Sequence, residues 1–92
     1  LMMLIDRPQE QETLFKEIAD SERTVMFYES PHRILKTLES LTKFAPAKKV
    51  TIARELTKIH EEVLEGTALE LATFIEKEGK DRGEFVVIVL PE

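Results

Sequence analysis

The chain changes from a strand to a helix within nine residues, Val25-Met26-Phe27-Tyr28-Glu29-Ser30-Pro31-His32-Arg33. Its first four residues are apolar or aromatic, as expected for a buried strand. Serine is a preferred residue for capping a helix, and proline suits the first helical position, because its missing N–H costs nothing there. We therefore expect a helix to begin at about Pro31, with Ser30 as its N-cap.

Polar side chains follow this strand and also a second expected strand, Lys48 to Glu55. The first cluster contains Tyr28, Glu29, Ser30, Pro31, His32 and Arg33, and the second contains Arg54, Glu55, Leu56, Thr57 and Lys58. Open α/β sheets bind ligands at the carboxyl ends of strands and the amino ends of helices. If the two strands are neighbours, both clusters converge on one edge. That edge would offer cations for phosphates, carboxylates for ribose hydroxyls and a tyrosine ring for stacking. The alternative is two surface turns with weak ion pairs.

Apolar residues at helical spacing predict two helices around the first strand. One is expected over residues 8–21, burying Leu14, Phe15, Ile18 and Ala19. The other runs from Pro31 to Phe44, and its apolar stripe consists of Ile34, Leu35, Leu38, Leu41 and Phe44. Its polar face carries Arg33, Lys36, Thr37, Glu39, Ser40 and Lys43. The first five residues are apolar but have no partner that the sequence identifies.

The second half of the chain predicts three more elements. A short edge strand is expected from about His60 to Glu65. Thr67-Ala68-Leu69-Glu70 has the form of a capping box, which predicts a helix from Thr67 that ends at Gly79. Gly83 to Leu90 is the most continuously apolar stretch and is therefore expected to be a central strand.

The expected order is α, β, α, β, β, α, β over 92 residues, which indicates one domain. Helices connect the first strand to the second and the third to the fourth. The fold class is therefore predicted to be α/β, with a mixed four-stranded sheet and crossover helices packed on it.

Composition excludes several kinds of site. There is no cysteine, which rules out disulfides, thiolate metal ligands and a cysteine nucleophile, and three glycines are too few for a glycine-rich phosphate loop. His60-Glu61-Glu62 resembles the start of a zinc-protease motif, but residue 64 is leucine, so no metal site is expected. Ser30 and His32 are not expected to form a nucleophile pair, because Ser30 is assigned to the helix cap.

Charge is distributed unevenly along the chain. The net charge is −5, yet residues 23–58 contain eight Lys or Arg and three Glu. Such a stretch can give an acidic protein a basic face that contacts phosphates, although a solvated surface explains it as well. The longest apolar run is too short to cross a bilayer, so a cytoplasmic protein without a membrane partner is expected.

Three motifs resemble a known family. They are Phe27-Tyr28-Glu29-Ser30-Pro31-His32-Arg33, Ala53-Arg54-Glu55-Leu56-Thr57-Lys58-Ile59-His60-Glu61-Glu62 and Gly83-Glu84-Phe85-Val86-Val87. Residues 24–90 resemble the carboxyl-terminal domain of the ribosomal RNA small-subunit methyltransferase I family, within the tetrapyrrole (corrin/porphyrin) methylase superfamily. The resemblance implies S-adenosyl-L-methionine-dependent 2′-O-methylation of a cytidine in 16S rRNA of the small ribosomal subunit. It also implies a homodimer and a cofactor held between two α/β domains. The family's amino-terminal domain, with its cofactor loops, is absent from these 92 residues, so the chain alone is expected to be inactive.

The resemblance also implies roles for the two clusters. It assigns Tyr28, Glu29, Ser30 and Pro31 to the cofactor, and His32, Arg33, Arg54, Thr57 and Lys58 to RNA. Transfer to a 2′-hydroxyl requires a proton acceptor, for which Glu29, His32 and Glu55 are the candidates. Two other functions remain open: a tetrapyrrole methyltransferase domain, and a non-catalytic dimerisation or RNA-binding module.

Overall fold

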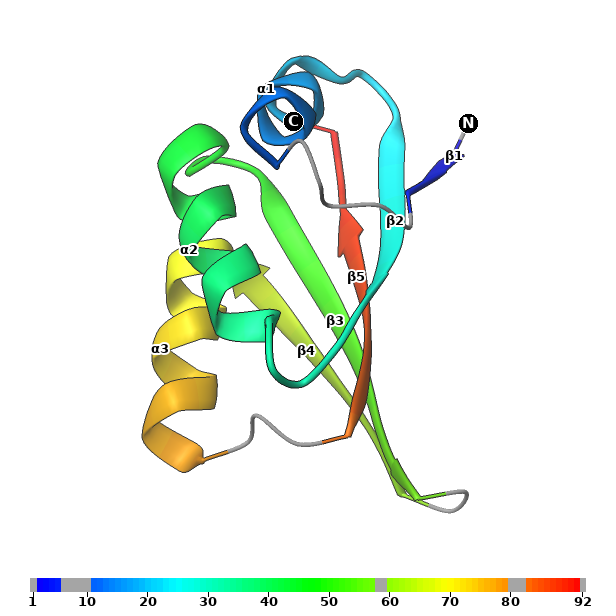
Figure 1. The fold of residues 1–92 in the computed structure, drawn as a ribbon, viewed down its shortest axis with the longest axis vertical. Helices are drawn as coiled ribbons and strands as arrows, with labels where there is room; N and C mark the ends of the chain where they lie inside the picture. The colour runs from blue at the N-terminus through cyan, green and yellow to red at the C-terminus, as the bar shows by residue number, and fades with distance from the viewer. Residues whose placement is uncertain (1, 6–10, 58–59, 80–82, 92) are drawn as a thin grey trace.

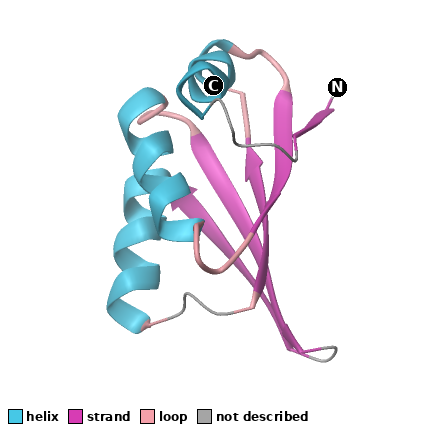
Figure 2. Ribbon diagram, in the orientation of Figure 1, coloured by secondary structure: helices cyan, strands magenta, loops and turns pink. Residues whose placement is uncertain are grey.

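The computed structural model of the protein describes residues 2–5, 11–57, 60–79 and 83–91. Within these ranges the chain forms one sheet of five strands and three helices (Figure 1; Figure 2). In chain order the elements are β1 (Met2–Ile5), α1 (Gln11–Asp20), β2 (Thr24–Glu29), α2 (Ile34–Phe44), β3 (Lys49–Thr57), β4 (His60–Thr67), α3 (Ala68–Glu78) and β5 (Glu84–Val89). The predicted α/β class and the predicted order of elements from α1 onward are confirmed.

The strands lie in the order β1-β2-β5-β3-β4. β1 is parallel to β2, whereas the pairs β2 with β5, β5 with β3 and β3 with β4 are antiparallel. The central place of β5 and the edge place of β4 are both as predicted. Helix α2 connects β2 to β3 and crosses β5, which lies between these two strands. Helix α3 connects β4 to β5 and crosses β3. β2 and β3 are thus parallel but separated by β5, so the idea that they are direct neighbours is wrong.

A fifth strand joins the four that were predicted. Met2 pairs with Thr24 and Ile5 with Phe27, so β1 adds a parallel edge to the sheet. The first residues therefore do have a partner, contrary to the sequence analysis. The reason is that β5 takes only one side of the apolar strand β2 and leaves its other side for pairing.

One hydrophobic core lies between the sheet and the helices. Alternate strand residues face the helices and are buried, as period-two alternation requires: Val25, Phe27, Val50, Ile52, Phe85, Val87 and Val89. The helices contribute Phe15, Ile18, Ile34, Leu38, Leu41, Ala68, Leu71 and Ile75. All three helices lie on this side of the sheet in Figure 1. The predicted apolar stripes are confirmed, with Leu14, Leu35, Phe44 and Ala72 packed partly buried at their margins.

Helix α3 begins and ends where its sequence predicts. The Thr67 N–H donates to Glu70 Oε1 over 2.9 Å, and the Glu70 N–H donates to Thr67 Oγ1 over 3.2 Å. Gly79 closes the helix with φ of 65°, a left-handed conformation that glycine adopts without a Cβ clash.

Helix α2 begins three residues later than predicted, at Ile34. Residues 31–33 form a turn in which the Arg33 N–H donates to the Ser30 carbonyl over 3.0 Å. Arg33 is the N-cap residue, and no side chain caps the helix. The assignment of Ser30 as cap was therefore wrong, because the turn places it too far from the helix start. The expected start of the first helix, at residues 8–10, lies outside the described residues.

Candidate functional site

The two polar clusters lie at the same end of the sheet, one strand apart. Glu29 of β2 and Arg54 of β3 both pair with Phe85 of β5, and Glu55 pairs with Glu84. The ends of β2 and β3 therefore flank the beginning of β5. The two clusters therefore lie on either side of β5, at the same end of the sheet.

Strand alternation divides the cluster residues between the two faces of the sheet. On the face away from the helices, Tyr28 pairs with Val86, Val86 with Ala53, and Ala53 with Val63. Tyr28 and Val63 are 64% and 66% exposed, so this row is open to a ligand or partner. Glu29 and Arg54, one residue farther along their strands, point to the helix side.

A groove of about 280 Å³ combines residues from both clusters. Its lining consists of Tyr28, Ala53, Arg54, Glu55, Glu61, Glu62, Val63, Glu84, Phe85 and Val86. The exposed row provides an apolar floor, and the carboxylates of Glu55, Glu61 and Glu84 come from paired positions on three strands. The β3–β4 register shifts between Glu55 and Thr57, and such irregularities often redirect side chains beside functional sites. The groove can therefore hold a flat ring on its apolar floor, and its carboxylates can accept hydrogen bonds from donor groups attached to that ring.

A second depression, of about 270 Å³, adjoins the groove at Tyr28. It is lined by Tyr28, Glu29, Ser30, Pro31, Glu84 and Phe85. The four residues predicted to contact the cofactor thus lie in one place. Tyr28, Glu84 and Phe85 line both hollows, so the two are continuous around the exposed ring of Tyr28.

Arg54 is engaged within the sheet. Its side chain is 6% exposed, and its Nη2 lies 3.2 Å from Oε1 of Glu62, the residue paired with it on β4. Since a cation already paired in this way has little surface to offer, Arg54 chiefly joins the ends of β3 and β4. Contact between Arg54 and RNA stays a prediction.

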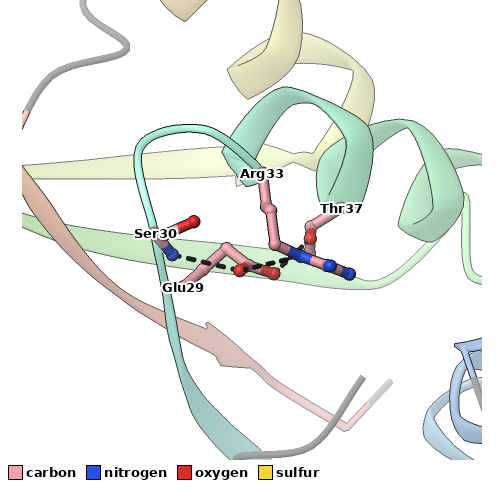
Figure 3. A network of polar contacts seen from close by, with 4 residues as sticks. All are labelled: Glu29, Ser30, Arg33 and Thr37. Atoms are coloured by element: carbon pink, nitrogen blue, oxygen red, sulfur yellow. Dashed lines mark hydrogen bonds and ion pairs between the residues drawn. The ribbon is translucent and has the colours of Figure 1, made fainter. Parts of the chain in front are cut away.

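Glu29 organises the turn that follows β2 (Figure 3). Its carboxylate accepts a hydrogen bond from the Thr37 hydroxyl and another, of 3.0 Å, from the Ser30 N–H. Arg33 Nε lies 3.5 Å from Oε1 of the same carboxylate. Three residues, on both sides of the turn, are therefore tied to one buried carboxylate.

Thr37 is the residue that the sequence analysis missed. It was placed on the polar face of its helix, but only 3% of it is exposed. The available signal was its position three residues after Ile34 and four before Leu41, which places it beside the apolar stripe. A threonine there can bury its methyl group while its hydroxyl reaches an acceptor, here Glu29.

The remaining predicted residues are less defined. His32 is exposed on the turn before α2, and Thr57 is the last residue of β3. Lys58 lies outside the described residues. Within the described ranges, no three His, Cys, Asp or Glu residues are placed to hold a metal ion, and no helix is long and apolar enough to span a membrane.

Sequence comparison finds relatives among methyltransferases. The chain is 41% identical over 85 residues to "Ribosomal RNA small subunit methyltransferase I" of Synechocystis sp., covering 91% of the chain and 29% of that protein. Proteins of the same name match from Hydrogenobaculum sp. (40% identity, 89% of the chain, 36% of that protein) and Thermotoga maritima (34%, 92% and 38%). The chain thus spans about a third of the length of these curated relatives. No protein-family model matches it.

Comparison of structures finds the same fold in two methyltransferases. Cobalt precorrin-4 methyltransferase, a cobalamin biosynthetic enzyme, matches with a TM-score of 0.66 at 12% identity, over 98% of this chain and 40% of that one. The methyltransferase CobJ matches with a TM-score of 0.63 at 18% identity, over 98% and 41%. At these identities the likeness shows the fold alone. Together with the sequence relatives, it confirms the resemblance predicted from the three motifs.

Proposed function

Given that this chain is related over most of its length to enzymes named ribosomal RNA small subunit methyltransferase I, we propose that it is the carboxyl-terminal domain of such an enzyme. The proposed reaction is transfer of a methyl group from S-adenosylmethionine to the 2′-oxygen of a cytidine in 16S rRNA. An amino-terminal domain supplies the cofactor loops, the enzyme acts in the cytoplasm, and two copies form a homodimer. This chain supplies one wall of the cleft between the two domains.

The observation that carries this proposal is the groove shared by the two clusters. Tyr28 from the end of β2 and Glu55 from the end of β3 lie on the same open face, on either side of β5. Both belong to motifs that resemble the methyltransferase family. A surface that joins them at the carboxyl ends of two parallel strands is the expected position for a ligand.

The groove has the chemistry that an adenosyl group requires. The exposed Tyr28 ring offers a stacking surface, Val86 and Ala53 form an apolar floor, and Glu55 can accept hydrogen bonds from ribose hydroxyls. When bound, S-adenosylmethionine supplies an electrophilic methyl group on a sulfonium. The side chains of this wall orient the ligand and exclude water from one side of it.

Among the three candidate proton acceptors, exposure favours Glu55 and His32. Glu29 already accepts from Ser30 and Thr37 and is 8% exposed, so it is assigned to holding the turn. Glu55 is exposed and lines the groove, where its carboxylate can take the proton from a 2′-hydroxyl.

RNA contact is assigned to the turn before α2. Arg33 retains 38% exposure and His32 is exposed, so both can reach a phosphate or a base from the turn between β2 and α2. A tetrapyrrole substrate has weaker support, because the two structural neighbours match at 12% and 18% identity and the rRNA enzymes at 34% to 41%.

The test uses the complete protein with small ribosomal subunits that lack the modification. After incubation with S-adenosylmethionine, the rRNA is digested to nucleosides and analysed by mass spectrometry. We expect 2′-O-methylcytidine to appear. A methyl group on a base, or no transfer to rRNA by a folded protein, would overturn the proposed reaction.

The role of the groove is tested by Tyr28→Leu, which removes the stacking ring. We expect the KM for S-adenosylmethionine to rise about tenfold, since stacking of one base contributes roughly 1–3 kcal/mol. Phe74→Leu is the matched control, because Phe74 is an exposed aromatic residue on α3 and is not part of the groove lining. Equal KM values in both variants would remove Tyr28 from the cofactor site.

A further inference from the structure

The carboxylate of Glu29 connects the end of β2 to the second turn of α2. One oxygen accepts the Ser30 N–H, directly after the strand, and the other accepts the Thr37 hydroxyl, eight residues along the chain. In Figure 3 the bond from Thr37 reaches across the base of the turn formed by residues 31–33, and the bond from Ser30 holds the same carboxylate on the strand side. The turn is thus closed by side chains and does not depend on a conventional helix cap.

The same carboxylate stands at the amino end of α2, which carries no side-chain cap and has no acidic residue in its first turn. A negative charge there is favoured by the partial positive charge of the helix. Because Glu29 comes from the preceding strand, it stabilises the helix start and also fixes that start relative to the sheet.

Arg33 is oriented by this carboxylate but is not enclosed by it. Its Nε is buried and makes no hydrogen bond, but it forms an ion pair with Glu29 Oε1 at 3.5 Å, while 38% of the Arg33 side chain is exposed. A guanidinium held at Nε can still use its terminal nitrogens for a second anion. The order of contacts is therefore Thr37 to Glu29 to Arg33, running from the buried helix face toward solvent.

We propose that Thr37 and Glu29 are positioning residues that orient the Arg33 guanidinium to bind a phosphate of the RNA substrate. The inference rests on the proposed function and adds a specific role for a buried pair that touches neither substrate nor cofactor. Without the Thr37 hydroxyl, Oε2 of the carboxylate loses its donor, and the group is held only through Oε1. Arg33 then keeps its charge but loses its fixed direction.

The experiment measures RNA binding and methyl transfer by the complete protein, carrying Thr37→Val, Thr37→Ser or neither. Valine keeps the volume of threonine and removes the hydroxyl, whereas serine keeps the hydroxyl. We expect Thr37→Val to raise the KM for rRNA about tenfold with kcat nearly unchanged. The KM of Thr37→Ser should stay close to that of the wild type. The salt dependence of RNA binding should flatten by a slope of about 0.7, corresponding to one lost phosphate contact.

Thr42→Val is the matched control. Thr42 lies on the same helix and also loses a hydroxyl bond, but that bond goes to the Leu38 carbonyl of the helix itself. Loss of stability alone would affect both valine variants in the same way. We expect only Thr37→Val to change the KM and the salt slope.

A double-mutant cycle with Arg33→Gln isolates the coupling. If Thr37 acts through Arg33, the double variant Thr37→Val/Arg33→Gln has the same KM for rRNA as the single variant Arg33→Gln. If Thr37→Val does not fold, Glu29→Gln takes its place in the cycle, since it keeps the shape and removes the charge. If the wild type methylates rRNA but the effects of Thr37→Val and Arg33→Gln on the KM simply add, this inference is overturned and the proposed function stands. Absence of rRNA methylation by the wild type would instead overturn the proposed function.

Discussion

Replacing Arg54 by methionine should reveal whether this residue serves the sheet or the RNA. Methionine keeps a long apolar stem and removes the guanidinium, so the ion pair between Arg54 and Glu62 across β3 and β4 is lost. Breaking a fully buried pair costs about 3–5 kcal/mol, and a fully exposed pair contributes about 0–1 kcal/mol. Arg54 is 6% exposed and Glu62 is 27% exposed, so Glu62 can recover part of its hydration. We expect the free energy of unfolding to fall by about 2 kcal/mol.

Urea denaturation of the complete protein measures this loss, and the exposed Lys49→Met on the same strand is its control. The control should change stability by no more than about 0.5 kcal/mol. Adding Glu62→Gln to Arg54→Met should cause little further loss, because the pair is already broken. RNA binding by the folded Arg54→Met variant should keep the salt slope of the wild type. The reasoning is refuted if stability is unchanged while the slope flattens by about 0.7, because Arg54 would then bind a phosphate.

Two further substitutions compare the two helix starts. Thr67→Ala should lower the free energy of unfolding by about 1 kcal/mol in the same denaturation assay, because it removes the side-chain oxygen that accepts the Glu70 N–H; an unchanged midpoint would show that the capping box does not hold α3. Ser30→Ala should change stability by less than about 0.5 kcal/mol, because the observed bonds of Ser30 use its backbone N–H and carbonyl. A loss near 1 kcal/mol for Ser30→Ala would mean that its side chain does cap α2.

Local sequence signals predicted the elements whose causes are local. The capping box at Thr67 and the glycine at residue 79 gave both ends of α3, and these contacts join residues three or four positions apart. Along the strand expected from Lys48 to Glu55, alternation puts Val50 and Ile52 on one face, and both are buried in the core. The continuous apolar run of β5 predicted a central strand, which the structure confirms.

The errors arose where contacts between different elements decide the outcome. Ser30 and Pro31 form a good helix start by themselves, yet the carboxylate of Glu29 and the hydroxyl of Thr37 make a different start available. Pairing of β1 with β2, and insertion of β5 between β2 and β3, depend on which strand edges remain unoccupied after folding. No spacing within a single segment contains that information.

The alternation of strand side chains explains how one motif can serve both structure and chemistry. Tyr28 and Glu29 are consecutive, yet one projects from the open face and the other is tied to the turn. Glu55 and Arg54 divide in the same way, with the exposed carboxylate in the groove and the buried cation paired to Glu62. In each cluster the residue facing the helices holds the backbone, and its neighbour is left for a ligand. It follows that substitutions at Glu29 and Arg54 should act mainly through the position or stability of their neighbours, whereas those at Tyr28 and Glu55 should act directly on the bound molecule.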